Sequence, residues 1–265
     1  MSILENHRIY FIGPLFMNHN YILYVSEEKC RIPDGTKEVI FDDDFNYPLR
    51  NIHIPSTVTH ITFGEGFNHD FREGQLPYGL FYLKLGKYFN SRLFYLPDSL
   101  KVLELGDNFN QPMSNIRFPK KLESLTFGKY FNQPLIYNLY KLTYLKFNGD
   151  YKYRFAHRCY DNTCWFHFPN LKTLIYSDQH TRKTWFEDEG KTYFSMNERL
   201  ETLVLPKSYN QPLLPEGRVS FGDVPRELYH QSCFLPKTLK NLKISKEFYE
   251  KNKEALSVIP NITFY

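Results

Sequence analysis

The chain has 265 residues, of which 42% are hydrophobic, 18% aromatic and 23% charged, so it can bury a sizeable core and is not a disordered tail. It has 24 Phe and 21 Tyr but only two alanines, Ala156 and Ala255; since alanine favours helices and aromatic residues favour strands, the composition argues against helical bundles and helical solenoids. The formal net charge of +4 comes from 33 basic and 29 acidic residues, and this balance argues against a nucleic-acid or membrane-surface partner.

Residues 1–31 are predicted to form an N-terminal β cap, with strands at Arg8–Ile12 and Asn20–Val25 around a turn at Gly13 and Pro14. Residues 9–25 are rich in apolar side chains, but Gly13 and Pro14 interrupt them. This segment is therefore neither a membrane span nor a signal-peptide core. The four cysteines are too few and too unevenly spread for a disulfide scaffold, which fits a reducing compartment. We therefore expect an intracellular, cytoplasmic protein.

Residues 32–147 consist of a repeat with a period of about 22 residues. Copies begin at Ile32, Ile54, Leu76, Leu96 and Phe118, and the last three spacings are 22, 20 and 22 residues. The consensus is apolar-Pro-x-x-Leu-x-x-Leu-x-Phe/Leu-Gly-x-x-Phe-Asn-x-Pro-Leu. Its apolar residues alternate over a few positions, which predicts one short strand per repeat with one packed and one solvated face.

Recurrent residues frame each predicted strand. A proline cannot donate a ladder hydrogen bond, so it should mark the turn before the strand. The glycine after the strand should allow a sharp turn, and the next phenylalanine should return a ring to the interior. The prolines are Pro33, Pro55, Pro77, Pro97 and Pro119; the glycines are Gly64, Gly86, Gly106 and Gly128; the phenylalanines are Phe45, Phe67, Phe89, Phe109 and Phe131.

An asparagine follows each of these phenylalanines, and we predict that the asparagines form a ladder. An amide side chain both donates and accepts, so stacked copies can satisfy backbone groups of adjacent turns that have no sheet partner. The alternative is that they are surface turn residues whose side chains point at solvent. The five asparagines are Asn46, Asn68, Asn90, Asn110 and Asn132.

Such short strands cannot fold alone, but stacked in register they build a parallel sheet with a continuous core. The predicted fold is mainly β, a leucine-rich-repeat-like β-solenoid of short parallel strands with capping elements. The two to four residues between one copy and the next leave no room for a regular helix. The side opposite the strands should therefore carry turns or extended chain.

The Phe-Asn-x-Pro tetrapeptides, with Leu-x-x-Leu-x-Phe-Gly before them, resemble the FNIP repeat family. They occur at Phe45, Phe109 and Phe131, and once more as Tyr209-Asn210-Gln211-Pro212. Such repeats are found mainly in social amoebae and in giant DNA viruses that infect amoebae. The resemblance implies a stacked scaffold that binds protein, here a viral protein that engages a host factor.

Members of this family often carry an F-box ahead of the repeats, which links the repeats to a ubiquitin ligase. An F-box needs more than the 31 residues that precede the first repeat here, and those residues are predicted to be strands. A ubiquitin-ligase substrate receptor that acts with a separate adaptor is therefore the alternative function.

Residues 148–245 continue with degenerate repeats, separated by three predicted loop insertions at 148–168, 177–198 and 206–234. The first insertion holds two imidazoles and two potential thiolates. A Cys2His2 tetrahedron is a common structural zinc site, but the neighbouring aromatic residues favour cysteines that are simply buried. The candidate ligands are His157, Cys159, Cys164 and His167. Zinc binding or hydrolytic activity in this half is a further alternative; no catalytic motif and no cofactor site is predicted.

Residues 246–265 are predicted to form a C-terminal cap, a short helix around 246–256 followed by a strand at 261–264. The outward positions of the strands should form a continuous face for a protein partner, with tyrosines as anchors and lysines beside them. The alternative is an ordinary solvated sheet face, since Thr and Tyr favour strands anyway. We expect a monomeric, non-enzymatic interaction scaffold. The predicted face comprises Glu38, His60, Thr62, Tyr82, Lys84, Glu104, Thr126, Tyr144, Lys146, Thr173, Thr202 and Lys243.

Overall fold

The computed structural model describes residues 21–25, 31–135, 139–151, 168–177, 194–195, 199–209, 213–215 and 233–265. These residues belong to two compact units, one up to Phe131 and the other from Asn132 onward. The predicted strand at Arg8–Ile12 and most of the three insertions lie outside the described residues.

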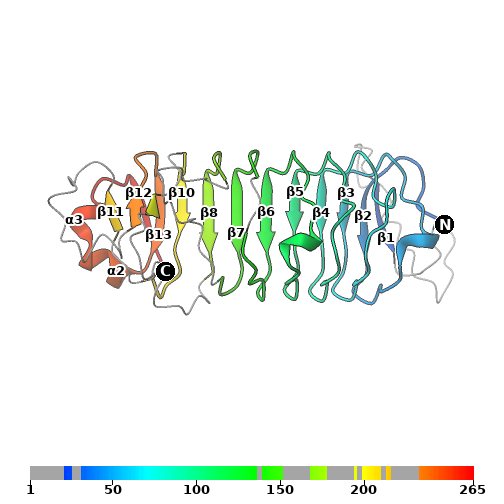
Figure 1. Cartoon of the computed structure of the whole chain (residues 1–265), viewed down its shortest axis with the longest axis horizontal. Helices are drawn as coiled ribbons and strands as arrows, with labels where there is room; N and C mark the ends of the chain where they lie inside the picture. The colour runs from blue at the N-terminus through cyan, green and yellow to red at the C-terminus, as the bar shows by residue number, and fades with distance from the viewer. Residues whose placement is uncertain are drawn as a thin grey trace. The chain divides into compact units, whose positions relative to one another are not determined.

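The first unit is a stack of short parallel strands that follow one another in chain order (Figure 1). They are β1 (Tyr21–Val25), β2 (Thr36–Phe41), β3 (His60–Thr62), β4 (Tyr82–Lys84), β5 (Val102–Glu104) and β6 (Ser124–Phe127). From β2 to β6 the pairing register is that of the sequence repeat, so equivalent residues lie side by side. One buried residue from each of the strands β2 to β6 contributes to a row of the core: Val39, Ile61, Leu83, Leu103 and Leu125.

The prolines of the repeat open the turns that lead into the strands, as predicted. In each case the proline carbonyl accepts a hydrogen bond from the backbone N–H three residues later, for example from Val58 to Pro55 at 3.1 Å and from Leu80 to Pro77 at 3.0 Å. A proline fits this position because its carbonyl accepts the turn hydrogen bond while its nitrogen needs no partner. The residue that donates is buried in each case; it is Thr36 after Pro33 and a hydrophobic residue after the other four prolines.

The phenylalanines after the strands form a column of stacked rings. Their centroids are 6.1 Å apart from Phe45 to Phe67, from Phe67 to Phe89 and from Phe89 to Phe109, and 6.3 Å apart from Phe109 to Phe131. All five side chains are at most 1% exposed. Each repeat therefore contributes one phenylalanine ring to the core of the solenoid, next to its strand.

The glycines after the strands have a further role that the sequence analysis did not predict. Only Gly35 and Gly74 among the described glycines have a positive φ, so the later glycines are not needed for a left-handed turn. Instead, a Cβ on Gly86 would lie 1.8 Å from the backbone oxygen of Gly64, and a Cβ on Gly106 would lie 1.8 Å from that of Gly86. Glycine is required because successive turns of the chain approach each other more closely than any side chain permits.

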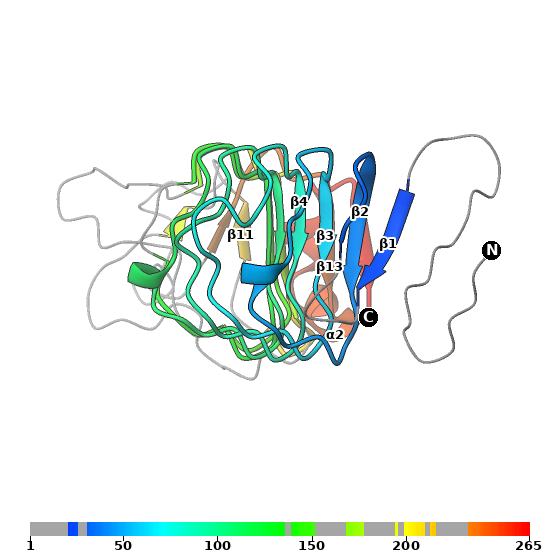
Figure 2. The same cartoon turned by 90° about the vertical axis from the view of Figure 1, so that its right-hand side faces the viewer.

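The side opposite the strands carries turns and extended chain, as predicted, together with two single-turn 3-10 helices. These are η1 (Leu49–Asn51) and η2 (Met113–Asn115), each of which buries its first residue. Figure 2 shows β2, β3 and β4 side by side, with their return segments looping away from the sheet. The return segments end at the proline turns and complete each coil.

The asparagines that follow the phenylalanines are hydrogen-bonded from one coil to the next. The side-chain oxygen of Asn46 accepts from the backbone N–H of Asn68 at 3.1 Å, that of Asn68 from Asn90 at 2.8 Å, and that of Asn90 from Asn110 at 2.9 Å. The first three residues are exposed, so this ladder runs along the surface of the first unit. It supplies acceptors for backbone N–H groups that lie beyond the ends of the strands.

We expect Asn68→Ala to lower the free energy of unfolding by about 1 kcal/mol, because the backbone N–H of Asn90 loses its acceptor. The Asn68 oxygen also accepts from the Ser91 hydroxyl at 3.0 Å, so both hydrogen bonds are lost together. Asn68→Asp is the matched control, since a carboxylate keeps both acceptors. Urea denaturation of the two variants tests this; equal stability of Asn68→Ala and wild type would show that the ladder does not stabilise the fold.

The second unit contains a parallel sheet of the same kind. Its strands are β7 (Tyr144–Phe147), β8 (Thr173–Tyr176), β10 (Thr202–Val204), β13 (Asn241–Ile244) and β14 (Asn261–Phe264). They pair in that order and in register, which matches the degenerate strand cores expected between the insertions. Both units are therefore built as a leucine-rich-repeat-like β-solenoid of short parallel strands, and the predicted fold is confirmed.

The prediction that the insertions are plain loops is wrong for part of the second and third insertions. Within them, β9 (Phe194–Ser195), β11 (Leu213–Pro215) and β12 (Cys233–Leu235) form a second parallel sheet in the order β11, β12, β9. Pairing between segments so far apart in sequence leaves no local pattern, and two or three residues are too few to show alternation.

The C-terminal residues form the elements expected there, with one difference. The predicted helix is divided into α2 (Lys246–Lys251) and α3 (Lys253–Leu256), which bury Phe248 and Leu256. The Ser245 side chain caps α2 by accepting from the backbone N–H of Phe248 at 3.2 Å. Their role as a cap, like the predicted division into 1–31, 32–147, 148–245 and 246–265, stays a prediction.

Candidate functional site

The outward side chains of β2 to β6 form two straight rows on the face of the sheet, because the strands are in register. They alternate with the buried core row and are mostly half-exposed. One row is Glu38, His60, Tyr82, Val102 and Ser124; the other is Ile40, Thr62, Lys84, Glu104 and Thr126. The structure thus places every predicted face residue of the first unit on one surface, which we call the sheet face. That a partner binds there stays a prediction.

Aromatic rings gather on the sheet face over β3 and β4. The ring of His60 lies 5.7 Å from the ring of Tyr82, with 26° between their planes, and 5.7 Å from the ring of Phe81. Phe81 is 40% exposed, so the cluster presents an apolar surface to solvent. We call these three residues the aromatic cluster.

Charged groups surround the aromatic cluster. Burial raises the pKa of Tyr82, and the negative charge of Glu104, the hydrogen bond to Glu104 and the charge of Glu38 raise it further. In this hydrogen bond the Tyr82 phenol donates and the Glu104 carboxylate accepts. On the other side, the Lys101 ammonium lies 5.9 Å from the centre of the Phe81 ring and 2.8 Å from a carboxylate oxygen of Glu123.

Phe81 and Lys101 belong to a third row that the sequence analysis missed. The residues just before the strands are joined by backbone hydrogen bonds, from Phe81 N–H to Thr59 at 2.8 Å and from Lys101 N–H to Phe81 at 2.9 Å. The alternation rule was applied only within the strands, so the preceding position was not counted. The repeat period would have found it, because Phe81 and Lys101 occupy the same position of successive copies.

The corresponding face of the second unit is mostly polar, with the half-exposed Ile175 and Val204 as its apolar residues. Tyr144, Thr173 and Thr202 lie in one row and Lys146 begins the next, so the predicted residues are again aligned. Glu201 lies 3.0 Å from Lys240 and 3.6 Å from Lys172, and the hydrogen bond from Lys240 is the main cause that lowers its pKa. Lys243 lies 4.3 Å from the centre of the Tyr265 ring.

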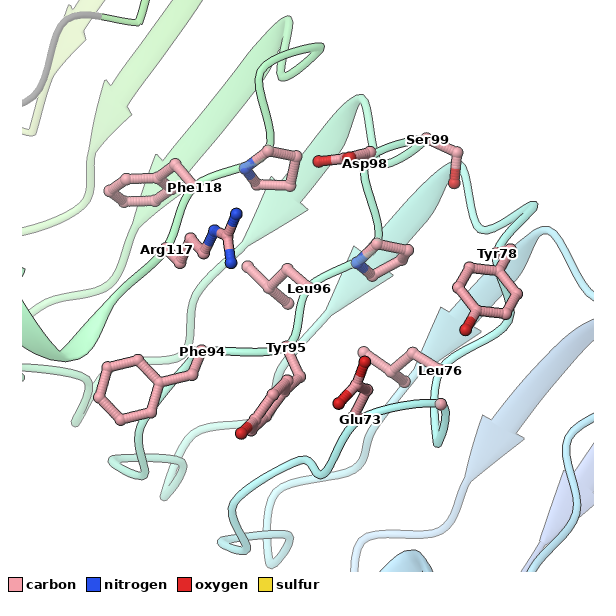
Figure 3. Close-up of a pocket in the computed structure, with 13 residues that line it drawn as sticks. Glu73, Leu76, Tyr78, Phe94, Tyr95, Leu96, Asp98, Ser99, Arg117 and Phe118 are labelled. Carbon is pink, nitrogen blue, oxygen red and sulfur yellow. The ribbon is translucent and has the colours of Figure 1, made fainter.

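A second candidate surface lies on the return segments of the first unit (Figure 3). It is a groove with a volume of about 260 Å³, bordered by three successive coils at residues 73–78, 94–99 and 117–119. Aromatic and proline rings, two carboxylates and one guanidinium line it. Sequence analysis did not predict this groove, although the shortened spacing of 20 residues between Leu76 and Leu96 marks its position.

Among the residues that the structure describes, no group of three or more His, Cys, Asp or Glu side chains is placed to hold a metal ion. The predicted zinc ligands His157, Cys159, Cys164 and His167 lie outside those residues, as do residues 152–167 of the first insertion. Within the described ranges, no helix has the length and apolar character to cross a membrane.

The sequence profile of the FNIP repeat family, described as "FNIP Repeat", matches residues 28–66 and 95–130. These segments contain β2, β3, β5 and β6, and the coils between them carry the phenylalanine column and the asparagine ladder. Two segments of the chain therefore match the FNIP repeat. The resemblance inferred from the Phe-Asn-x-Pro tetrapeptides is confirmed, and a comparison with curated proteins found no match.

Two solved structures that resemble this chain are described as leucine-rich-repeat proteins. One, titled as CroV588 with a novel circular LRR structure, is 20% identical with a TM-score of 0.32; the alignment covers 88% of this chain and 54% of that one. The other, from Bacteroides ovatus, is 14% identical with a TM-score of 0.22, and 90% of this chain and 66% of that chain are covered. The chain spans about half the length of the circular protein.

Proposed function

We propose that this FNIP-repeat protein is a non-enzymatic scaffold that binds a protein partner through the sheet face. The aromatic cluster of His60, Phe81 and Tyr82 is the observation that carries the proposal. Aromatic side chains that keep one exposed side while charged residues surround them are typical of the energetic centre of a protein interface. Scaffold folds of this repeat type support an interaction role in general.

The geometry of the sheet face favours a protein partner over a small ligand. Its rows are straight, and each is set by in-register strands, so the surface is broad and preformed. A preformed surface loses little conformational entropy on binding. The two anchors differ: Phe81 is 40% exposed, whereas Tyr82 is half-buried and hydrogen-bonded to Glu104.

The partner's identity rests on the resemblance. A host factor of an amoebal virus, bound in the cytoplasm by a monomeric chain, is part of this proposal. The alternative proposal is a ubiquitin-ligase substrate receptor. It requires that a cullin adaptor is found among the bound proteins. Zinc binding or hydrolysis in the second unit remains a separate prediction that metal analysis of the purified protein tests.

Phe81→Ala should weaken partner binding by roughly 30-fold, because a buried interface aromatic contributes about 2 kcal/mol. Tyr130→Ala is the matched control, since Tyr130 is 57% exposed but lies outside the sheet face. Affinity isolation from amoebal lysate with wild type and both variants, followed by titration of the isolated protein, measures the effect. If both variants retain the bound protein, or both lose it equally, the sheet face is not the binding surface.

A further inference from the structure

The groove on the return segments exists because one coil is shorter than its neighbours. The first residue of the next coil follows the ladder asparagine by eight positions at Leu76 and at Phe118, but by only six positions at Leu96. The short return segment therefore lies between two longer ones, and the groove opens over it. Because this return segment is two residues shorter than its neighbours, the solenoid lacks about the volume of a dipeptide on that side.

The walls of the groove are fixed by backbone hydrogen bonds. The short segment is joined to the following coil by bonds from Leu93 N–H to Asn115 at 2.9 Å and from Arg117 N–H to Leu93 at 2.8 Å. On the other side, Gln75 N–H donates to Arg72 at 3.2 Å and closes a turn that contains Gly74 with a φ of 77°. The groove is thus preformed, which reduces the entropic cost of binding a ligand.

The surface of the groove is built from rings. Tyr78 is 82% exposed, Tyr95 48% and Phe94 38%, while the buried prolines Pro97 and Pro119 contribute its floor. Grooves lined by aromatic rings are the surfaces on which extended, proline-containing segments dock, because a polyproline II helix is already ordered before it binds.

The charges around the rings favour a cation. Glu73 and Asp98 have no ion-pair partner within the described part of the chain, and in the view of Figure 3 Glu73 lies between the rings of Tyr78 and Tyr95. The guanidinium of Arg92 lies 5.8 Å from the centre of the Phe94 ring, so a ring of this groove already accepts a cation on its face. Arg117 supplies one opposing charge, which leaves the groove with a net charge of −1 from two acids and one base.

We propose that this groove binds an extended, proline-containing peptide segment whose arginine or lysine side chain lies against Tyr78 and Tyr95 and pairs with Glu73 and Asp98. The groove lies on the return segments, so this site is separate from the sheet face and does not depend on the proposed function. A scaffold with two sites can hold two segments of one partner, or two partners, at the same time.

The test uses two ten-residue probes, a proline-rich peptide with one central Arg and its twin with Glu in that position. Binding to the full chain is measured by fluorescence anisotropy. The Arg peptide should bind saturably and about tenfold more tightly than its twin, and Glu73→Gln combined with Asp98→Asn should remove most of that difference. Arg117→Gln, in the same groove, should leave binding of the Arg peptide unchanged or strengthen it, since it removes a like charge.

Tyr95→Ala and Tyr88→Ala form a matched pair, because the two rings are 48% and 49% exposed and only Tyr95 lines the groove. Tyr95→Ala should weaken the Arg peptide about tenfold, and Tyr88→Ala should not. Phe81→Ala should retain peptide binding, which separates this site from the sheet face. Absence of saturable binding, equal affinity for both probes, or a loss with Arg117→Gln larger than with the two acid substitutions would overturn the proposal.

Discussion

Gly86→Ala should destabilise the protein by about 3 kcal/mol or more, the upper part of the range for overpacked sites. The added Cβ would lie 1.8 Å from the backbone oxygen of Gly64, 2.4 Å from its carbonyl carbon and 2.8 Å from the Cα of Glu65. All three atoms belong to backbone, so no rotamer change can make room. The two coils must separate, and their separation also strains the strand pairing between β3 and β4 beside them.

Gly79→Ala is the control for Gly86→Ala. Gly79 is exposed, its φ is not positive, and a Cβ there would have its nearest contact at 3.5 Å, an ordinary distance. The midpoint of thermal unfolding, followed by circular dichroism, should fall by about 10 °C for Gly86→Ala and change little for Gly79→Ala. If the two variants melt together, the close approach of the coils is not what selects glycine.

Phe89→Ala should lower the free energy of unfolding by about 3–5 kcal/mol, the usual cost of deleting a buried ring. Phe89 is fully buried in the middle of the column, with Phe67 and Phe109 stacked at 6.1 Å on its two sides and Phe71 at 6.0 Å. Its loss leaves a cavity that neighbouring coils cannot fill without breaking their hydrogen bonds. The ring stacking on both sides is lost as well.

Two other variants show whether the effect of Phe89→Ala belongs to the column. Phe89→Leu keeps most of the volume and should cost less than about 1.5 kcal/mol. Phe81→Ala removes a ring that is 40% exposed and should cost far less than Phe89→Ala. Urea denaturation measures the free energy of unfolding of all three variants. If Phe89→Ala is as stable as Phe81→Ala, the phenylalanine column does not stabilise the core.

The sequence could predict the coil because each recurrent residue has a local cause. Pro55 and Pro77 mark turns through their missing N–H, and the alternation at Ile61 and Leu83 marks a strand with one buried face. The phenylalanine column and the ladder from Asn46 to Asn110 follow, because a fixed period brings like residues together. For the same reason the predicted rows of the sheet face were placed on one surface.

The features that sequence analysis missed depend on how coils meet. From the sequence, Gly86 is interpreted as a turn residue. The structure shows that the backbone of Gly64 lies so close that no side chain fits at position 86. The cluster of His60 with Phe81 includes a residue one position before the strand, which alternation does not count. The sheet formed by β9, β11 and β12 joins segments of two or three residues, too short for any period to appear.

By itself, the sequence determined the repeat, the parallel strands, the buried rows and the resemblance to the FNIP repeat, since each of these depends on residues within one period of 20 or 22. Only the tertiary structure decided which surfaces are available for binding. The sequence shows that one repeat is two residues shorter than the others. A groove forms there only because the short coil is stacked between two longer ones. The physical reason is that a period fixes which residues are neighbours, whereas the space between neighbours depends on the packing of whole coils.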